Sequence, residues 1–473
     1  MISDQKTIFS RAEEFGSDTA LINSKGMSLT YNQLIKIAAT VRQNIAGRPL
    51  VLLVCENDIY SVASYFSLIY HQIPVMLLHS SITSTFLNSI IERFRPGYIF
   101  APRGNQVLST DSAPREEIGN YQLKRLTGET LPTHSELALL LTTSGSTGST
   151  KFVRLSYNNL WSNTRDIVTR LGISNTERTI TTMPMSYTYG LSIINTHLFC
   201  GGSLVADELS IVSKPFFNAL NEYEVTSFGG VPFTYETLLK LKFWRSLPAS
   251  VKSLTQAGGK LKHPVFTELV NRCKELDVRF FSMYGQTEAT ARMAILDHQY
   301  AESKTGSIGL PVGEGRFLLL DENEQAIITP GKQGTLYYLG DNVSMGYANS
   351  WQDLNKGDEN RGTINTGDIA YFDEEGFYYV VGREKRFVKV HGHRVSLDEI
   401  ESILSTMGLE SAVLGEDDAI KIYAQPKSVA NEVLKQLAKT TKIPSRVFTY
   451  KEQEFIPRLK SGKVDYKTLA QLN

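Results

Sequence analysis

The chain has little cysteine: Cys55, Cys200 and Cys273 are its three cysteines, and they lie far apart in a sequence of 473 residues. This number and spacing favour a reducing compartment and argue against a disulfide framework or a zinc cluster. The chain also lacks an excess of basic residues, since Lys+Arg and Asp+Glu are both 49. A broad nucleic-acid interface needs such an excess, so we expect no nucleic-acid partner.

Long apolar runs are absent as well. The most apolar stretches have the length of strands and are interrupted by polar residues, so we expect no membrane span. The first residues lack the apolar core of a secretion signal, and a cytoplasmic location is therefore expected. A length of 473 residues allows two or three domains with a large core.

The chain does have a hydroxyl-rich segment, Leu141–Lys151, directly after the apolar run Leu137–Leu141. Glycine in such a loop lets the backbone turn its N–H groups toward an anion, while hydroxyl groups and a lysine add donors and charge. The segment is not a Walker A motif, because Gly148 is not followed by Lys and then Ser or Thr. Two interpretations are open at this point: a polyphosphate-binding loop and a surface linker.

Strand and helix patterns alternate in the N-terminal part. Continuous apolar strands separated by helices predict a parallel sheet that is covered on both faces. The strands are expected at residues 50–54, 74–78 and 98–101, with a helix at residues 59–70. Another helix is expected from about Ser156, because apolar residues then recur at helical spacing.

From about Gly315 the pattern changes to short strands between turns rich in Gly, Asp and Asn, which predicts a small β-barrel subdomain. These strands are expected at residues 316–320, 335–339 and 377–381. The last part of the chain predicts a separate α+β lobe, whose first helix begins at a capping box, Ser396–Glu399. Its further elements are expected at residues 419–424 (strand), 431–439 (helix) and 446–449 (strand).

Four more motifs follow the hydroxyl-rich segment: Tyr284–Glu288, Asn365–Asp368, Gly382–Arg394 and Arg458–Lys463. With these motifs in this order, the chain resembles the adenylate-forming superfamily, which contains acyl-CoA synthetases, the adenylation domains of peptide synthetases and beetle luciferases. The resemblance extends over almost the whole chain. It favours phosphate binding over a linker for the hydroxyl-rich segment.

The resemblance implies a two-step reaction with ATP and Mg²⁺ as cofactors. A small carboxylic acid attacks the α-phosphate of ATP, which gives an acyl-adenylate and pyrophosphate, and a thiol then displaces AMP. The thiol is expected to belong to CoA or to the phosphopantetheine of a separate acyl or peptidyl carrier protein. The implied fold is α/β: a large N-terminal domain of parallel-type sheets flanked by helices, a small β-barrel subdomain, and a small mobile α+β C-terminal domain.

The resemblance also implies which residues bind ATP. The β- and γ-phosphates would be held by the loop residues Thr143, Ser144, Gly145, Ser146, Thr147, Gly148 and Lys151. Thr150 stands where family members often carry proline. The adenine and ribose would be bound by Gly258, Gly259, Tyr284, Asp368 and Arg383. Thr287 would contact the α-phosphate, and Glu288 would hold Mg²⁺, which prefers hard carboxylate oxygen.

The C-terminal motifs imply a mobile catalytic lobe. Lys463 would place its charge on the α-phosphate and the attacking carboxylate, and Lys385 matches the position of the hinge in the family. The implied domains are 1–384, with α/β subdomains over about 1–310 and a β subdomain over about 311–384, and the lobe 385–473. Gly392 would leave room for the thiol arm, whereas His391 and His393 are interpreted as solvated loop residues.

The acyl pocket is expected at the segment Met183–Gly190 and at a second glycine-rich segment. Its predicted lining consists of Tyr187, Tyr189, Gly190, Gly229, Gly230 and Val231, with core packing as an equal alternative for Tyr189. No acidic residue occurs from Met183 to Gly201. Because a buried ammonium needs an acidic partner, the substrate is expected to lack an α-ammonium group.

Two other functions are open from the sequence. The acyl group could pass to an amine instead of a thiol, or the chain could be an inactive nucleotide-binding homologue. The second alternative is disfavoured because Glu288, Asp368, Arg383 and Lys463 are all present. A carrier domain is not expected in the chain, since it ends at Asn473, shortly after the catalytic motif.

Overall fold

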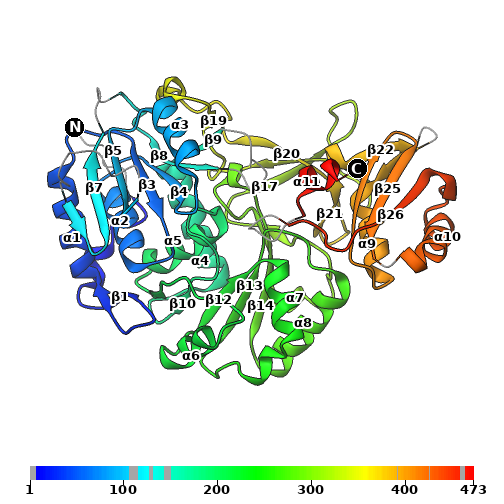
Figure 1. Cartoon of the computed structure of the whole chain (residues 1–473), viewed down its shortest axis with the longest axis horizontal. Coiled ribbons are helices and arrows are strands. Elements are labelled where there is room, and N and C mark those ends of the chain that lie inside the picture. Colours follow the sequence, from blue (N-terminus) through cyan, green and yellow to red (C-terminus); the bar gives the residue numbers. More distant parts are fainter. Residues whose placement is uncertain are drawn as a thin grey trace.

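The computed structural model of the chain describes residues 7–105, 116–126, 131–142, 151–390, 393–425, 427–458 and 464–472. Three layered parts follow one another from the N-terminus to the C-terminus in Figure 1: two large sheets with helices, a smaller all-β sheet, and a C-terminal lobe. Among these residues, no helix has the length and apolarity that crossing a membrane requires.

The first sheet has the strand order β19-β9-β8-β4-β3-β5-β7-β6. Its central strands are parallel, and β7 and β9 add antiparallel edges. The strands are β3 (Val51–Cys55), β4 (Val75–His79), β5 (Tyr98–Pro102), β6 (Glu116–Ile118), β7 (Tyr121–Arg125), β8 (Leu137–Thr142), β9 (Phe152–Ser156) and β19 (Tyr347–Ala348). Alternate residues of the buried strands face two cores, as the pleat dictates.

Helices cover both faces of this sheet. Val51, Leu53 and Cys55 of β3 pack with α1 (Tyr31–Asn44) and α2 (Ile59–Tyr70), whereas Leu52 and Val54 pack with α3 (Ser84–Phe94). The predicted parallel sheet with helices on both faces is therefore confirmed. The helix predicted at residues 59–70 is α2, which Asp58 caps by accepting from the Tyr60 and Ser61 N–H groups.

The second sheet has the strand order β16-β15-β14-β13-β12-β10-β11-β1-β2. Its members are β1 (Thr19–Ile22), β2 (Ser28–Thr30), β10 (Arg178–Ile180), β11 (Ser203–Val205), β12 (Ser227–Gly230), β13 (Ser253–Gln256), β14 (Arg279–Tyr284), β15 (Ala294–Leu296) and β16 (Leu310–Pro311). The strands from β14 to β1 in this order are parallel, and β15, β16 and β2 pair antiparallel at the edges.

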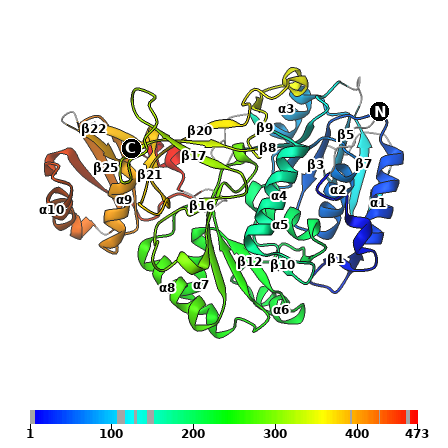
Figure 2. The same cartoon turned by 180° about the vertical axis from the view of Figure 1, so that it is seen from behind.

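One face of the second sheet packs against α6 (Lys214–Glu222), α7 (Pro232–Lys240) and α8 (His263–Glu275). The other face packs against α4 (Tyr157–Leu171) and α5 (Thr188–Phe199). Helix α5 also contributes Leu191 and Leu198 to the core of the first sheet, so it is sandwiched between the two sheets. Seen from behind in Figure 2, α4 and α5 lie between the two sheets.

The region predicted to be a small β barrel is a four-stranded antiparallel sheet. Its strands, in order across the sheet, are β17 (Arg316–Leu320), β18 (Gly334–Leu339), β20 (Thr363–Phe372) and β21 (Tyr378–Arg383). In this order β17 and β21 are edges, so the sheet does not close on itself within the described residues, and the expectation of a barrel is corrected. The predicted strand at residues 316–320 is β17.

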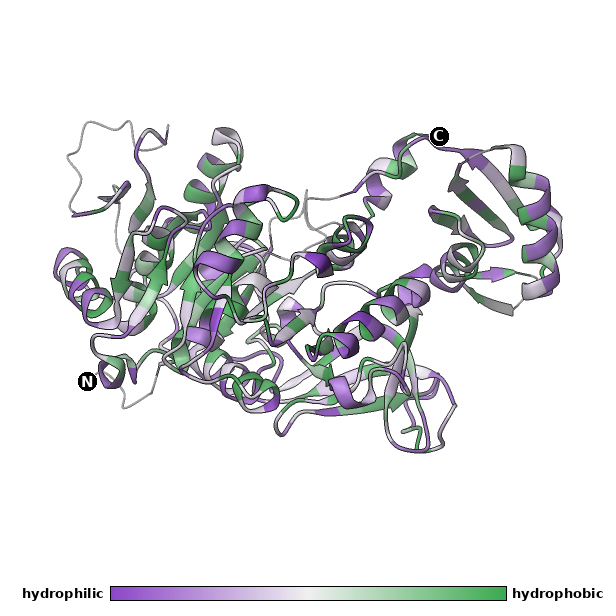
Figure 3. Cartoon of the chain, turned by 90° about the horizontal axis from the view of Figure 1, so that it is seen from below, coloured by the Kyte–Doolittle hydropathy of each residue, from purple (hydrophilic) through white to green (hydrophobic). Residues whose placement is uncertain are grey.

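The C-terminal lobe has its own apolar core, which includes Ile400, Ile422 and Leu437. It is built from β22 (Phe387–Val390), β23 (His393–Ser396), α9 (Leu397–Thr406), β24 (Ser411–Glu416), β25 (Ala419–Ala424), α10 (Ala430–Thr441), β26 (Phe448–Glu452) and α11 (Tyr466–Gln471). Ser396 caps α9 by accepting from the Glu399 N–H at 3.2 Å. In Figure 3, where hydropathy is coloured, strands of the large sheets are mostly apolar and the outward helices carry polar stretches.

Candidate functional site

A cleft of about 1600 Å³ lies where the second sheet, the four-stranded sheet and the C-terminal lobe meet. It collects predicted site residues that are far apart in the sequence. Those that line it are Tyr187, Val231, Gly258, Gly259, Tyr284, Thr287, Glu288, Asp368, Arg383 and Lys385. Parallel strands β12, β13 and β14 end at this cleft, which is the edge at which open α/β sheets bind ligands.

The nucleoside side of the cleft is centred on Asp368, whose carboxylate has three polar partners. Arg383 Nε lies 2.8 Å from Asp368 Oδ1, Tyr284 Oη donates to Oδ2, and Gln286 Nε2 donates to Oδ2 at 3.3 Å. Strand β20 carries Asp368 opposite Arg383 of β21, since the two residues are register partners. The sheet itself therefore forms this carboxylate–guanidinium pair.

Burial raises the pKa of Asp368 above its usual value, and the charge of Arg383 and the bonds from Tyr284 and Gln286 oppose this shift. Tyr284 is also buried, and its pKa is raised far above the ordinary value of a phenol by burial and then by the charge of Asp368. The Tyr284 phenol therefore stays neutral and donates to the Asp368 carboxyl group. A buried carboxylate of this kind is a suitable acceptor for two ribose hydroxyl groups.

The phosphate side of the cleft joins three residues around Tyr347. The Tyr347 hydroxyl donates to Glu288 Oε1 at 2.8 Å, and Lys151 Nζ lies 3.7 Å from the centroid of the same ring. The tyrosine thus brings the predicted phosphate lysine and the predicted metal carboxylate to one side chain. Burial, followed by the charge of Glu288, raises the pKa of Tyr347 and keeps it a donor.

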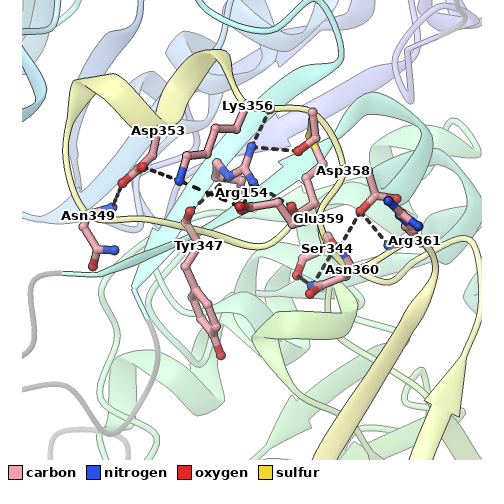
Figure 4. Close-up of polar contacts among 12 residues, drawn as sticks. Arg154, Ser344, Tyr347, Asn349, Asp353, Lys356, Asp358, Glu359, Asn360 and Arg361 are labelled. Carbon is pink, nitrogen blue, oxygen red and sulfur yellow. Dashed lines mark hydrogen bonds and ion pairs between the residues drawn. The ribbon is translucent and has the colours of Figure 1, made fainter.

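Arg154 fixes the backbone of Tyr347. Its fully buried guanidinium donates to the carbonyl oxygens of Tyr347 at 3.1 Å and Met345 at 2.7 Å. It also donates to the carbonyl of Lys356 at 2.5 Å and to Glu359 Oε2 at 2.6 Å. Figure 4 shows these bonds and the Tyr347 ring extending away from Arg154. Five donors in a rigid fork suit such a hub, which lysine cannot reproduce.

Gly258 and Tyr187 form a close contact at the predicted acyl side of the cleft. Gly258 has a φ of +85°, and a Cβ at this position would lie 2.7 Å from the Tyr187 hydroxyl. Both the positive φ and this contact require glycine. Tyr187 is the N-terminal cap of α5, and burial raises its pKa to about 12, so its hydroxyl is neutral.

Tyr189, Gly190, Gly229 and Gly230 are not among the residues that line the cleft. Tyr189 lies behind the lining, where its hydroxyl donates to the Thr255 carbonyl at 2.9 Å. Gly229 makes room for it, because a Cβ there would lie 2.6 Å from the Tyr189 hydroxyl. These residues form the layer that supports the cleft wall, and their contact with an acyl group stays a prediction.

The hinge segment faces the C-terminal lobe through a charged cluster. Lys385 and Arg386 belong to a single 3₁₀ turn, Glu384–Arg386. Arg386 pairs with Asp398 and with Glu401, the latter at 2.8 Å. Tyr466 of α11 completes the cluster: its hydroxyl donates to Glu401 Oε2 at 2.9 Å, and its ring lies 4.0 Å from Arg386 Cζ. The cluster joins the hinge, α9 and the C-terminal helix.

Several predicted residues lie outside the described residues. These are the loop residues Thr143, Ser144, Gly145, Ser146, Thr147 and Gly148, together with Gly392 and Lys463. Sequence reasoning missed Tyr347, Gln286 and Arg154. Gln286 had a signal, since it lies inside the motif Tyr284–Glu288. Tyr347 and Arg154 had none, because a single tyrosine or arginine beside a strand is not a pattern.

The carboxylate of Glu288 fits the magnesium role that the motif implies. Tyr347 donates to Oε1 of Glu288, and Oε2 of Glu288 forms no hydrogen bond or ion pair with the described part of the chain. Among the residues that the structure describes, no group of three or more His, Cys, Asp or Glu side chains gathers there either. Mg²⁺ commonly uses one or two carboxylates together with substrate phosphates and water, so a lone carboxylate facing a phosphate site is suitable.

The chain is similar in sequence to known proteins. The chain is 27% identical over 386 residues to a luciferin 4-monooxygenase of Photuris pensylvanica, covering 78% of this chain and 70% of that protein. It is 26% identical to a 2-succinylbenzoate–CoA ligase of Bacillus subtilis (strain 168), covering 69% of this chain and 67% of that protein.

Two solved structures have the same fold. One is o-succinylbenzoate CoA synthetase from Bacillus subtilis in complex with its acyl-adenylate intermediate, with a TM-score of 0.78, 20% identity and 98% of both chains covered. The other is ATP-bound MatB from Rhodopseudomonas palustris, with a TM-score of 0.79, 20% identity and 99% of both chains covered. The expected fold class is thereby confirmed.

The family model of the AMP-binding enzymes matches residues 8–348. This range includes Lys151, Glu288 and Tyr347, which contact one another on the phosphate side, and Tyr284, which lines the cleft. The resemblance found in the sequence is confirmed, and the chain belongs to the AMP-binding enzyme family.

Proposed function

We propose that this chain is an AMP-forming acid–thiol ligase. A carboxylate oxygen of a small acid attacks the α-phosphorus of ATP, the bond to the β-phosphate oxygen breaks, and pyrophosphate leaves. The sulfur of a thiol then attacks the acyl carbon, and AMP leaves. The observation that carries the proposal is that one cleft joins a nucleoside-binding side at Asp368 to a phosphate-binding side at Tyr347.

The nucleoside half is supported by the three partners of Asp368. When ATP binds, Asp368 would accept the ribose hydroxyls, Arg383 would stay beside it, and Tyr284 would present its ring to the adenine. Gly258 and Gly259 would let the purine approach the backbone of the opposite wall. Because Arg383 is half exposed whereas Asp368 is buried, the guanidinium can adjust to the ligand and the carboxylate stays fixed.

The phosphate half is supported by the Lys151–Tyr347–Glu288 contacts. Lys151 would pair with the β- and γ-phosphates, and Glu288 would hold Mg²⁺. The metal would neutralise negative charge on the phosphate oxygens, as divalent ions do in phosphoryl transfer. Thr287, which is buried beside Glu288, would hold the α-phosphate oxygen, and Lys463 would stabilise the charge that develops there.

For the acceptor we propose CoA, with the phosphopantetheine of a carrier protein as the alternative. The Bacillus subtilis relative is a CoA ligase by name, and Lys385 and Arg386 place charged hinge residues at the cleft. We further propose that the chain acts in the cytoplasm, because its substrates ATP and CoA are there. Residues 1–384 and 385–473 would be the two domains that rotate about Lys385.

The proposal is tested by ATP–pyrophosphate exchange with a panel of carboxylic acids that includes 2-succinylbenzoate, aryl acids, short fatty acids and α-amino acids. We expect exchange with at least one acid, but none with the α-amino acids. CoA, a pantetheinylated carrier protein or an amine is then added to separate the acceptors. Exchange with no acid would contradict the proposal, and product formation only with the amine would overturn the thiol step.

A matched pair of variants assigns the exchange to the cleft. Asp368→Asn should lower ATP affinity, because the amide cannot accept from both ribose hydroxyls and still pair with Arg383. Asp321→Asn is the control, since Asp321 accepts from the backbone N–H groups of Asn323 and Gln325 in its own turn and does not line the cleft. Equal effects of the two substitutions would remove Asp368 from the nucleotide site.

A further inference from the structure

Arg292 is a buried cation that has no counter-ion in the described part of the chain. Its side chain lies just before β15, and the residue is 2% exposed. Its Nε and Nη1 atoms are buried, and within the described residues neither has a hydrogen-bond partner. The backbone is fixed, since Asn163 Nδ2 donates to the Arg292 carbonyl at 2.7 Å. The side chain therefore cannot reach solvent by a simple shift of the chain.

The environment of the guanidinium is aromatic and neutral. Arg292 Cζ lies 5.3 Å from the centroid of the Tyr189 ring, and no Asp or Glu of the described chain forms an ion pair with it. Burial lowers its pKa to about 10, so the group is still a cation at neutral pH. Arg154, the other deeply buried arginine discussed above, differs because its donors are taken by carbonyls and by Glu359.

Arg292 lies one layer behind the predicted acyl side of the cleft. Gly285, which lines the cleft, packs on the backbone of Arg292: a Cβ on Gly285 would lie 2.9 Å from Arg292 Cα. Tyr189, against which the guanidinium stacks, shares an apolar cluster with Tyr187 and Val231, which also line the cleft. Arg292 itself is not among the residues that line the cleft, so a ligand would reach the guanidinium only by passing between Tyr187 and Val231.

Unpaired buried charges are costly, and a carboxylate is the natural partner of a guanidinium. The planar fork of arginine binds carboxylate through two parallel hydrogen bonds, and a buried charge that loses or lacks its partner destabilises a fold. Tyr189 cannot serve as the partner, because its hydroxyl already donates to Thr255 and its pKa is raised to about 12.

We infer that Arg292 recognises a second carboxylate on the acyl substrate, so that the acid activated by this chain is a dicarboxylic acid. The inference rests on the proposed function, because it identifies the substrate class for the same cleft. One carboxylate would react at the α-phosphate, while the other would accept from the Arg292 guanidinium at Nε or at Nη1, which face different sides of the group. A monocarboxylic acid of equal length would leave the guanidinium without this acceptor, which is a strong ground for rejection.

The test compares the free dicarboxylic acids glutarate and adipate with their monomethyl esters in ATP–pyrophosphate exchange. The wild type should favour the diacids. Arg292→Met, which keeps the length of the side chain without its charge, should lose about 10- to 100-fold in kcat/KM for the diacid and little for the ester. The kcat/KM of Arg292→Lys for the diacid should lie between that of the wild type and that of Arg292→Met. An unchanged diacid-to-ester ratio in Arg292→Met would overturn the inference.

Arg279→Met is the matched control. Arg279 also lies beside an aromatic ring of the second sheet, 5.7 Å from the Phe281 centroid, but it donates to the Leu171 carbonyl. Its loss should leave the diacid-to-ester ratio unchanged. A shift as large as that of Arg292→Met would mean that the ratio reports general damage, and it would overturn the inference.

A binding measurement without ATP separates this inference from the proposed function. Glutarate or adipate alone should raise the melting temperature of the wild type but not that of Arg292→Met. If no acid supports exchange and this stabilisation is still seen, the ligase function fails and the anion site stands. If exchange occurs with monocarboxylic acids and the diacids do not stabilise the wild type, the ligase function stands and the role of Arg292 is wrong.

Discussion

At the scale of single residues, the hydroxyl group of Tyr347 links the two charged groups of the phosphate side. Tyr347→Phe should raise the KM for Mg–ATP about fivefold, since a lost hydrogen bond to a charged group of this exposure is worth about 1 kcal/mol. The ring that faces Lys151 at 3.7 Å stays in place, so only the bond to Glu288 is removed. Exchange kinetics at varied Mg–ATP measure the effect.

Tyr70→Phe is the control for this substitution. The Tyr70 hydroxyl donates to Glu13 Oε1 at 2.9 Å on the surface of the N-terminal part, and it is not among the residues that line the cleft. Its loss should leave the KM for Mg–ATP unchanged. If Tyr347→Phe behaved like Tyr70→Phe, the bond to Glu288 would have no part in nucleotide binding.

The raised pKa of Asp368 predicts a pH-dependent affinity for ATP. Only the ionised carboxylate accepts both ribose hydroxyls, so affinity should fall as pH falls through this pKa, and the fall should begin above the range of an ordinary aspartate near 3.9. Arg383 lowers this pKa. Arg383→Gln should therefore move the midpoint of the affinity profile to higher pH. Titration of a fluorescent ATP analogue at a series of pH values measures the midpoint.

Arg316→Gln is the matched control for the pH profile, because Arg316 is exposed on β17 of the same sheet. It should leave the midpoint where it is in the wild type. A midpoint that moves to lower pH in Arg383→Gln would contradict the sign of the interaction between Arg383 and Asp368.

The sequence motifs predicted Asp368, Arg383 and Tyr284 as nucleotide-binding residues, and in the structure Asp368 contacts both of the others. Tyr347, Arg154 and Arg292 could not be found in this way. Their contacts join segments far apart in the chain: the bond from Arg154 to the Tyr347 carbonyl spans 193 positions. A single buried arginine has no local signal in the sequence. Arg154 and Arg292 differ in the hydrogen-bond acceptors around their side chains, and these acceptors come from distant segments of the chain.

At the scale of elements, the cluster between the hinge and α11 predicts how the C-terminal motif is held. Tyr466 follows Lys463 by three positions, and it bonds to Glu401 while stacking on Arg386. Tyr466→Ala should slow the adenylation step about tenfold without changing ATP affinity, because the segment with Lys463 would lose its anchor. Tyr466→Phe keeps the stacking and should lose less.

Single-turnover formation of pyrophosphate measures this adenylation step, and nucleotide titration measures ATP affinity. Gln471→Ala is the control, because Gln471 is an exposed residue at the end of the same helix. A parallel loss of ATP affinity in Tyr466→Ala would show that the cluster supports the nucleotide site rather than the position of Lys463.

Element boundaries were predictable where local signals were strong. The helix at residues 59–70 agrees with α2 because Asp58 caps it, and the strand at residues 419–424 agrees with β25. The strand expected at residues 446–449 begins only at Phe448, since Ser445–Val447 form a 3₁₀ turn. The barrel was wrong because closure of a sheet depends on which edges pair, and no local pattern encodes that choice.

At the scale of the whole molecule, two lobes predict that the two half-reactions can be lost separately. Lys463→Ala should slow adenylation by about a hundred- to a thousandfold yet spare thioester formation from a supplied acyl-adenylate. Gly392→Leu should do the reverse, because its side chain would obstruct the thiol. Pyrophosphate exchange and CoA thioester formation, measured separately, check both. Equal loss of both half-reactions in either variant would contradict its assigned role.

The general architecture followed from the sequence, but the arrangement of the cleft did not. The order of the strands places β19, which is formed by residues late in the chain, at the edge of the first sheet beside β9. In Figure 1 the C-terminal lobe lies beside the four-stranded sheet. Only this long-range pairing brings Tyr347 next to Lys151, so the phosphate side depends on tertiary structure that motifs do not specify.

The buried Arg154 hub has a consequence for how nucleotide affinity can change. Arg154 is expected to touch no substrate, yet it sets where Tyr347 stands by bonding to the carbonyls of Met345, Tyr347 and Lys356 and to the Glu359 carboxylate. Substitutions at the exposed residues 356–359 would alter the spacing between Lys151 and Glu288 while leaving every nucleotide-binding side chain intact. Natural variation or engineering could thus adjust the affinity for ATP from a surface segment, without cost to the chemistry of the site.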